Sequence, residues 1–450
     1  MEQNYKGRRK FIKNSTLLFA GIASGSALGS LNAKSYNRVV GANARLLVGV
    51  MGVNNRGLAL ATNFAKQRNA EIGYVSDVDS RASAKCVTEL SKIQSKVPKE
   101  LPDFRHALEQ KDMDIMINAT PDHWHTPGAI IALQAGKHVY LEKPIAHNPY
   151  EGELLVAAQK KYKPLIQVGN QRRSFPNVAE GIRQLHSGII GNIYYTKTWY
   201  NNSRATIGFG KTAPVPSWLN YDLWQGPAPR TPFKDNLIHY NWHWFWNWGT
   251  AESLANGIHM VDLALWGMQL KHPTKVTSSG GIYTLKDDRE TPDTQIITLE
   301  YGDKGTIVWE GLSANGRRTE GDSVGVMFYG EKGSLFIGSG NGYKLYDLKG
   351  KVLKDVKSDI KVDPTNLFNP AGLLDSFHIQ NMFSAIKNGT ALNSDVFSAQ
   401  ISNHALALGN IALRTSQMLD INADTGKILN NKKAMRYWKR PYEKGWEPGI

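Results

Sequence analysis

The chain has 450 residues, of which 41% are hydrophobic and 21% charged, which excludes disorder as its main state and favours about two to three domains. A single cysteine, Cys86, excludes disulfides within the chain and cysteine-based zinc sites, and it suits a packed position better than a nucleophile. The formal net charge of +15 would suit a nucleic-acid partner, but no RNA- or DNA-binding motif accompanies it. We therefore expect no nucleic-acid function.

Residues 1–33 are expected to be an export signal rather than part of the fold. Arg8 and Arg9 precede a weakly apolar run from Ser15 to Leu31, which resembles a twin-arginine signal peptide. An ordinary secretory signal and an uncleaved anchor are the alternatives, but the run is short and Gly-broken for a membrane span of about 20 apolar residues. We expect no membrane span, and export of the already folded protein to the periplasm.

Residues 44–168 alternate strand and helix patterns, as in a parallel, doubly wound α/β sheet. The expected strands are Ala44–Met51, Glu71–Ser76, Asp114–Ala119, His138–Leu141 and Leu165–Val168. The expected helices are Gly57–Gln67, Thr126–Ala135 and Tyr150–Lys161. This arrangement predicts an N-terminal Rossmann domain.

In residues 169–424 the regular alternation of strand and helix patterns ends. Several successive strand patterns there predict a second, α+β domain on a mostly antiparallel sheet. The expected strands are Gly281–Leu285, Thr294–Tyr301, Gly305–Leu312, Ser323–Tyr329, Gly333–Ile337 and Gly342–Tyr346. Two expected helices follow, Leu373–Ile386 and Ala399–Met418. The basic tail over 425–450 is expected to wrap the surface.

The turn after the first strand is a candidate dinucleotide site. It reads Gly-Val-Asn-Asn-Arg-Gly from Gly52 to Gly57, with Asn54 in place of the middle glycine of the Rossmann fingerprint. The following helix N-terminus would face a pyrophosphate. Asp77, at the end of the second strand, would bind the ribose 2′-hydroxyl and repel a 2′-phosphate. The sequence therefore favours NAD as the cofactor. NADP is an alternative, because Arg81 lies nearby in the sequence, and a domain without a nucleotide is another.

Two motifs follow at a characteristic distance: Thr-Pro-x-x-x-His at 120–125 and Glu-Lys-Pro at 142–144. With Gly169–Arg173 and Asn256–Asp262, they make the chain similar to the Gfo/Idh/MocA oxidoreductases, the relatives of glucose–fructose oxidoreductase and inositol dehydrogenase. The chain looks like an exported, Bacteroidetes-type sugar dehydrogenase branch of that family. The resemblance implies tightly bound NAD and a sugar substrate.

The resemblance also implies roles for individual residues. Lys143 would lie between nicotinamide and substrate and polarise the reacting oxygen, and His259 would take the hydroxyl proton. The residues expected to contact the cofactor are Gly52, Asn54, Asn55, Arg56, Gly57, Asp77, Thr120, Pro121, His125, Glu142, Lys143 and Gln171. Family dehydrogenases usually carry an Asp four residues before this His; here the residue is Ala255, which predicts a different proton relay.

A Trp-rich stretch is the candidate carbohydrate face. Eight of the 12 Trp residues lie within 199–266, most densely from Asn241 to Trp248, and we expect about half of them to line the site and half to form a core. The expected substrate-binding residues are Arg172, Trp242, His243, Trp244 and His259. His123 and His125 could pair with His239 or His243 on a metal, but no acidic ligand spacing supports this, so no metal is expected.

Together these features favour NAD-dependent oxidation of a sugar hydroxyl, at C3 of a glucoside or disaccharide, to a 3-keto sugar. The cofactor would stay bound and be recycled by a second substrate or an electron acceptor. A keto-glycoside lyase would be a downstream partner. The sequence leaves open whether the chain forms a homo-oligomer. One alternative is a glycosidase acting by transient oxidation, although family-109 glycoside hydrolases usually lack the lysine of Glu-Lys-Pro. The other is a non-catalytic binding module, which Ala255 favours and Lys143 and His259 oppose.

Overall fold

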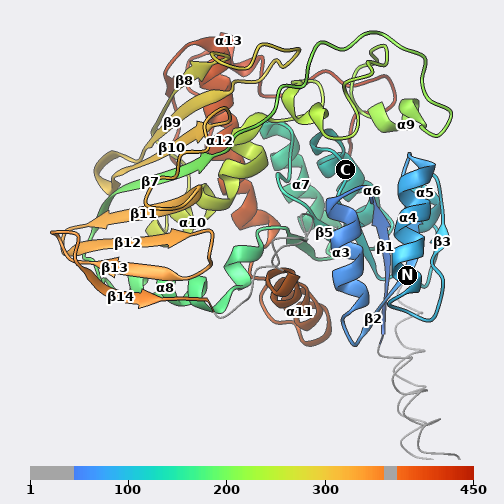
Figure 1. Ribbon diagram of the computed structural model, residues 1–450, viewed down its shortest axis with the longest axis horizontal. Coiled ribbons are helices and arrows are strands. Elements are labelled where there is room, and N and C mark those ends of the chain that lie inside the picture. The colour runs from blue at the N-terminus through green and yellow to red at the C-terminus, as the bar shows by residue number, and fades with distance from the viewer. Residues whose placement is uncertain (1–44, 359–371) are drawn as a thin grey trace, which may run out of the picture. The chain divides into compact units, whose positions relative to one another are not determined.

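The computed structural model describes residues 45–358 and 372–450, and Leu46–Ile450 cluster into one unit (Figure 1). The expected signal peptide at 1–33 lies outside the described residues. Within the described part of the chain, no helix is long and apolar enough to cross a membrane.

The N-terminal half is built on a six-stranded parallel sheet with the order β3-β2-β1-β4-β5-β6. The strands are β1 (Leu46–Met51), β2 (Ala70–Ser76), β3 (Lys99–Glu100), β4 (Ile115–Asn118), β5 (His138–Leu141) and β6 (Ile166–Val168). The central strands are almost wholly buried, because helices cover both faces, and this explains their continuous apolar runs. The strand order reverses between β1 and β4, and a crevice opens at the carboxyl ends of strands at such a point.

Helices connect these strands. They are α3 (Arg56–Ala65), α4 (Ser80–Ser91), α5 (Phe104–Leu108), α6 (Asp122–Gln134) and α7 (Pro149–Tyr162). The expected strands and helices of this half are confirmed, except that α6 begins four residues before the predicted start, at Asp122 in place of Thr126. Cys86 on α4 is fully buried, and burial raises the pKa of its thiol to about 12, as expected for a packed residue.

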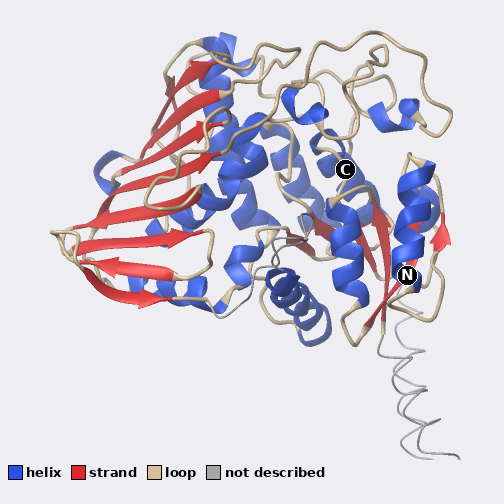
Figure 2. Cartoon of the chain, in the orientation of Figure 1, coloured by secondary structure: helices blue, strands red, loops and turns tan. Residues whose placement is uncertain are grey.

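The C-terminal half is built on a nine-stranded sheet with the order β14-β13-β12-β11-β7-β10-β9-β8-β15 (Figure 2). The strands are β7 (Ile193–Asn201), β8 (Lys275–Gly281), β9 (Thr294–Glu300), β10 (Thr306–Leu312), β11 (Val324–Gly330), β12 (Gly333–Gly338), β13 (Tyr343–Tyr346), β14 (Val352–Val356) and β15 (Leu419–Asp420). Every pairing is antiparallel except that of β7 with β10. The predicted fold class is therefore confirmed.

Helices α8 (Pro176–His186), α10 (Ile258–Met268) and α12 (Val396–Thr415) share one apolar core with this sheet. Helix α11 (Gly372–Asn388) packs mainly elsewhere: its Ile379, Met382 and Phe383 pack with Phe64 and Tyr140 of the parallel-sheet half. The chain thus returns to the first half late in the sequence, and this return brings a carboxylate close to the turn after β1.

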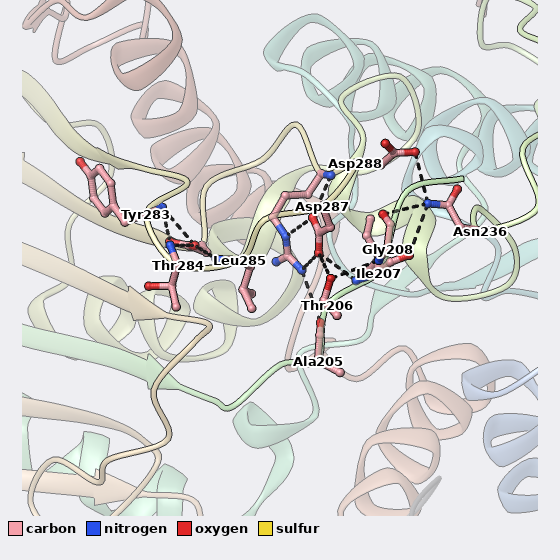
Figure 3. Close-up of polar contacts among 12 residues, drawn as sticks. Ala205, Thr206, Ile207, Gly208, Asn236, Tyr283, Thr284, Leu285, Asp287 and Asp288 are labelled. Atoms are coloured by element: carbon pink, nitrogen blue, oxygen red, sulfur yellow. Dashed lines mark hydrogen bonds and ion pairs between the residues drawn. The ribbon is translucent and has the colours of Figure 1, made fainter. Parts of the chain in front are cut away.

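The predicted strand Gly281–Leu285 is wrong. Strand β8 ends at Gly281, and the backbone N–H groups of Tyr283, Thr284 and Leu285 all donate to the carboxylate of Asp293, at 2.8–3.2 Å (Figure 3). Amides that converge on one side chain cannot donate to a neighbouring strand. The central strand β7 is not among the expected strands, although its β-branched and aromatic residues are typical of a strand.

The C-terminal tail is more deeply anchored than expected. It contains the short helix α13 (Lys432–Met435), and its Trp438 is only 5% exposed. Its Glu443 accepts the N–H of Arg230, five residues after the short helix α9 (Tyr221–Gln225), at 3.3 Å. Arg440 forms a buried ion pair with Glu151 of α7 at 2.8 Å. The tail therefore joins the two halves instead of only wrapping the surface.

Candidate functional site

A cavity of about 480 Å³ opens at the carboxyl ends of β1, β2, β4 and β5. Its other wall comes from the segment that follows β7, with Tyr240, Ala255 and Asn256. The expected site residues that line it are Gly52, Asn54, Asn55, Arg56, Asp77, Thr120, Pro121, His125, Glu142, Lys143, Trp242 and His243. The expected residues that lie outside this lining are Gly57, Gln171, Arg172, Trp244 and His259.

The turn after β1 has the geometry of a nucleotide cradle. Gly52 has φ +78°, and a Cβ there would lie 2.8 Å from the carbonyl oxygen of Ala119. A Cβ on Gly57 would lie 1.8 Å from the carbonyl oxygen of Gly52, so the start of α3 can approach this turn only with glycine. No side chain caps the N-terminus of α3, which leaves its first N–H groups for an anion. These residues fit the pyrophosphate of a dinucleotide.

Asp77 lies in this cavity beyond the end of β2. Its carboxylate accepts the N–H of Val53 at 2.6 Å and the N–H of Asp79 at 2.9 Å, which fixes its orientation and leaves further lone pairs. Burial raises the pKa of Asp77, and these two N–H groups oppose that shift. The guanidinium of Arg81 is held by Asp79 at 2.8 Å and lies 3.4 Å from the ring centroid of Trp218.

Lys143 is anchored by residue 255, the position at which this chain has Ala in place of the Asp of the family pattern. Its Nζ donates to the backbone carbonyl of Ala255. Burial lowers the pKa of Lys143, and the charges of Glu142 and Asp122 oppose that shift. The backbone carbonyl of Ala255 therefore holds the side chain of Lys143 in position.

His259 lies on α10, one helical turn beyond Ala255. Its pKa is held well below its usual value, first by burial and then by the positive charges of Lys143 and Arg172. A neutral imidazole near a lysine can accept a proton. Arg172 itself donates to the carbonyl of Gly338 at 3.0 Å and to Oδ1 of Asn341 at 2.8 Å, so its guanidinium is tied to the antiparallel-sheet half.

Trp242 and His243 form a stacked pair in the wall opposite the turn. Their ring centroids lie 3.6 Å apart with an interplanar angle of 19°. Nδ1 of His243 donates to the carbonyl of Tyr240 at 2.6 Å, and burial lowers the pKa of His243 to about 3. Nε2 is therefore left as an unprotonated acceptor. This pair offers an aromatic face and a hydrogen-bond acceptor to a ligand.

Trp244 belongs to the packing behind this wall. It is 2% exposed, with the guanidinium groups of Arg204 and Arg289 at 5.3 Å and 5.6 Å from its ring. Arg289 forms a fully buried ion pair with Asp287, which also accepts the N–H of Ile207 at 2.8 Å (Figure 3). These contacts hold the long segment after β7 in place.

A buried network supports the cofactor side of the cavity. Arg56 donates to Glu142 at 2.7 Å and to both oxygens of Asp375 on α11, at 2.7 Å and 2.8 Å. Gln171 lies behind the cavity wall and donates to Glu142 at 3.2 Å and to the hydroxyl of Tyr140 at 3.3 Å. Arg56 is thus clamped between residues that are far apart in the sequence.

Sequence reasoning missed several residues of this site. Asp122, Trp224, His239, Tyr240 and Asn256 all line the cavity. Asp122 stands inside the Thr-Pro-x-x-x-His motif, and Tyr240 stands directly before the Trp-rich stretch, so proximity to a known motif was the available signal. Burial raises the pKa of Asp122, whose carboxylate accepts the hydroxyl of Thr250 at 2.5 Å.

The histidines considered for a metal do not converge. Nε2 of His123 faces the carbonyl of Trp224 at 2.9 Å, and His239 bonds Asp79 at 2.7 Å. Both ring nitrogens of His125 face carbonyl oxygens, at 2.5 Å and 2.8 Å. Within residues 45–358 and 372–450, no three His, Cys, Asp or Glu side chains are grouped so as to hold a metal ion.

Curated relatives match less than half of the chain. A glycosyl hydrolase family 109 protein of Saccharopolyspora erythraea is 30% identical over 208 residues, which are 43% of this chain and 45% of the relative. An alpha-N-acetylgalactosaminidase of Shewanella oneidensis is 26% identical over 213 residues, again 43% and 45%. The chain thus matches less than half the length of these relatives.

Solved structures share the fold over most of the chain. A levoglucosan dehydrogenase in complex with NADH and levoglucosan has a TM-score of 0.64 at 15% identity, covering 84% of this chain and 99% of that one. The WlbA dehydrogenase of Bordetella pertussis, in complex with NADH and UDP-GlcNAcA, has a TM-score of 0.61 at 17% identity and the same coverage.

Models of one family match both halves. Residues 46–170 match the oxidoreductase family, NAD-binding Rossmann fold, and residues 198–448 match the oxidoreductase family, C-terminal alpha/beta domain. These two matches cover most of the chain, including the turn after β1, Lys143 and His259. The chain belongs to the Gfo/Idh/MocA oxidoreductase family.

Proposed function

We propose that this protein oxidises a ring hydroxyl of a glucoside or disaccharide, at C3, to a 3-keto sugar with tightly bound NAD. The observation that carries the proposal is the position of Lys143: it lies in the same cavity as the Gly52 turn, near the neutral His259 and opposite the Trp242–His243 pair. The cofactor turn, Lys143 and the aromatic pair therefore line one cavity, and His259, outside that lining, is close enough to Lys143 for its charge to lower the pKa of the imidazole.

NAD is the proposed cofactor in preference to NADP. The carboxylate of Asp77 faces the cavity at the end of β2, where it would bind the ribose hydroxyls and repel a 2′-phosphate. The guanidinium of Arg81, which could otherwise neutralise that phosphate, is engaged by Asp79 and stacked on Trp218. Bound NAD supplies the hydride acceptor.

Four side chains would bind the sugar and handle its proton. The ammonium of Lys143 donates a hydrogen bond to the reacting oxygen and stabilises its developing negative charge. The neutral imidazole of His259 accepts the hydroxyl proton, directly or through a water. Trp242 stacks on the C–H face of the sugar, and Nε2 of His243 accepts a hydrogen bond from a neighbouring hydroxyl.

A glycosidase that oxidises its substrate transiently is the second candidate. The relatives named glycosyl hydrolase family 109 protein and alpha-N-acetylgalactosaminidase favour it. Stoichiometry separates the two reactions, because a dehydrogenase accumulates keto sugar and reduces an acceptor, whereas a transiently oxidising glycosidase releases free sugars without net oxidation.

The test is incubation of the purified protein with a panel of glycosides, with and without an artificial electron acceptor, followed by mass spectrometry. Our proposal expects a product two hydrogens lighter than the substrate, formed in quantity only with the acceptor. Free sugars without the acceptor would support the glycosidase, and unchanged substrates together with saturable sugar binding would support the binding module.

We also propose that the protein is exported in the folded state to the periplasm. The support is the Arg8-Arg9 pair before the weakly apolar run. The test is cell fractionation of the protein with Arg8→Lys and Arg9→Lys together, which we expect to retain it in the cytoplasm. Unchanged export of that variant would point to the ordinary secretory route.

A further inference from the structure

A second cavity, of about 320 Å³, lies between the start of α7, the end of α12 and the C-terminal tail. No residue that lines it also lines the first cavity. Thr250 stands between the two: it lines the second cavity, and its hydroxyl donates to Asp122 of the first. The volume lies at the lower end of small-molecule sites, roughly 300–1,000 Å³.

All the charged side chains that line this second cavity are positive. Its lining residues include four cationic side chains and no carboxylate; the four are Arg414, Arg436, Lys439 and Arg440. Lys439 and Arg440 have partners outside the lining, Glu447 and Glu151. Arg414 and Arg436 have no ion pair within the described residues. A place for an anion is therefore left inside the cavity.

Arg440 carries an unused donor at this place. Its Nε binds Glu151 at 2.8 Å and its Nη2 donates to the carbonyl of His123 at 2.7 Å, while Nη1 is buried without a hydrogen-bond partner. Both ring nitrogens of His147, another lining residue, are also buried without a partner. Buried polar groups left unpaired cost free energy, and an oxyanion in the cavity would accept hydrogen bonds from Nη1 of Arg440 and from the one N–H of the neutral His147 ring.

The guanidinium of Arg414 packs against two aromatic rings. It lies 4.6 Å from the ring centroid of Trp246 and 4.2 Å from that of Tyr437. Burial lowers the pKa of Arg414, and the charge of Glu290 and a hydrogen bond with Tyr437 oppose that shift. Glu290 accepts the N–H of Trp246 at 2.8 Å and forms no ion pair with Arg414. A cation at the C-terminus of α12 is favourable by itself, but this does not explain why three further cations line the same cavity.

We propose that the second cavity is a binding site for an oxyanion, the carboxylate, sulfate or phosphate group of a small ligand. Arg414 and Arg436 at the mouth would bind the anion, and the inner donors of Arg440 and His147 would complete its hydrogen bonds. The indole of Trp246 and the side chain of Asn247 also line this cavity, which suits an anion carried by a sugar ring. This site is separate from the oxidation proposed above and does not depend on it.

The test is calorimetric titration of the NAD-loaded protein, in a buffer of low ionic strength, with phosphate, sulfate, glucuronate and the neutral control glucose. The double variant Arg414→Gln/Arg436→Gln removes the two unpaired cations and spares the buried ion pair of Arg440. Arg317→Gln is the matched control, since Arg317 is exposed and lines neither cavity. NAD content, measured in every variant, checks the fold and the first cavity.

We expect the anions to bind, the double variant to weaken them at least about tenfold, and the control to leave them unchanged. Tighter binding of glucuronate than of phosphate and sulfate would identify an acidic sugar, and equal binding of all three a free-anion site. Binding that survives in the double variant, equal binding of glucose and glucuronate, or no anion binding would each overturn the proposal.

Discussion

The two walls of the first cavity obtain their geometry in different ways. The wall at the strand ends is fixed by main-chain contacts: a positive φ at Gly52, the close approach of Gly57 and two N–H groups that hold Asp77. The wall with Trp242 and His243 is fixed by side chains, through ring stacking and the buried Arg289–Asp287 ion pair. We infer that the first wall tolerates few changes, whereas the second can be altered residue by residue.

Gly57→Ala should have the largest effect, because its Cβ would lie 1.8 Å from the carbonyl oxygen of Gly52. We expect loss of bound NAD by about a hundredfold or more, measured as nucleotide released on denaturation and by calorimetry of the apoprotein. Gly152→Ala on α7 is the control, because its Cβ would make only ordinary contacts, with the side chain of Gln400 at 3.4 Å and the Cβ of Ala146 at 3.8 Å. Normal NAD content in Gly57→Ala would mean that this turn does not hold the cofactor.

Lys143→Ala and His259→Ala should each lower kcat by about a hundredfold, the range of a lost acid–base group, while NAD content and folding persist. Both side chains are expected to act on the proton in transfer, so KM should change less than kcat. Lys160→Ala, an exposed lysine on α7, is the control. Near-normal turnover in both variants on the best glycoside would remove these two residues from the mechanism.

Trp242→Ala and Trp244→Ala should separate the surface of the second wall from its packing. Trp242 lines the cavity, so we expect a rise in KM of about tenfold or more with little change in NAD content. Trp244 is 2% exposed and outside the lining, so its loss should lower the free energy of unfolding by about 3–5 kcal/mol. Denaturant unfolding together with kinetics measures both, and the same pattern in the two variants would contradict the distinction.

Asp77→Ala should weaken NAD by about tenfold and NADP less, because it removes both the ribose acceptor and the charge that repels a 2′-phosphate. The measurement is calorimetry of the apoprotein with the two nucleotides. Asp424→Ala, at an exposed position that lines neither cavity, is the control. An unchanged preference would mean that Asp77 does not bind the ribose.

The difference between the walls also decided what the sequence could reveal. The turn from Gly52 to Gly57 and the positions of Asp77 and Lys143 follow from local patterns, because strand, turn and helix are contiguous in the chain. Asp375 could not be found in this way: α11 returns to Arg56 from more than 300 positions away, and only tertiary contacts report this. Likewise, no local rule shows that the carbonyl of Ala255 receives Lys143.

Acid should destabilise both halves of the molecule through buried histidines. His378 in the parallel-sheet half and His404 in the antiparallel-sheet half each have a pKa lowered to about 4 by burial. The unfolded chain, with a histidine pKa of about 6.5, then binds more protons than the folded one, so stability falls as the pH drops below about 6.5. Between about pH 7.5 and about pH 5.5, each such histidine should reduce the free energy of unfolding by about 1.3 kcal/mol.

His404→Gln tests this smallest effect. Glutamine can still donate to the carbonyl of Gly426, which Nε2 of His404 faces at 2.8 Å, but it does not titrate. We expect the variant to lose about 1.3 kcal/mol less stability than the unmodified protein between the two pH values, measured by urea unfolding. His106→Gln, at an exposed position, should leave the pH dependence unchanged. An equal loss in His404→Gln and the unmodified protein would mean that His404 does not become protonated on unfolding, and the acid response would then belong to other groups.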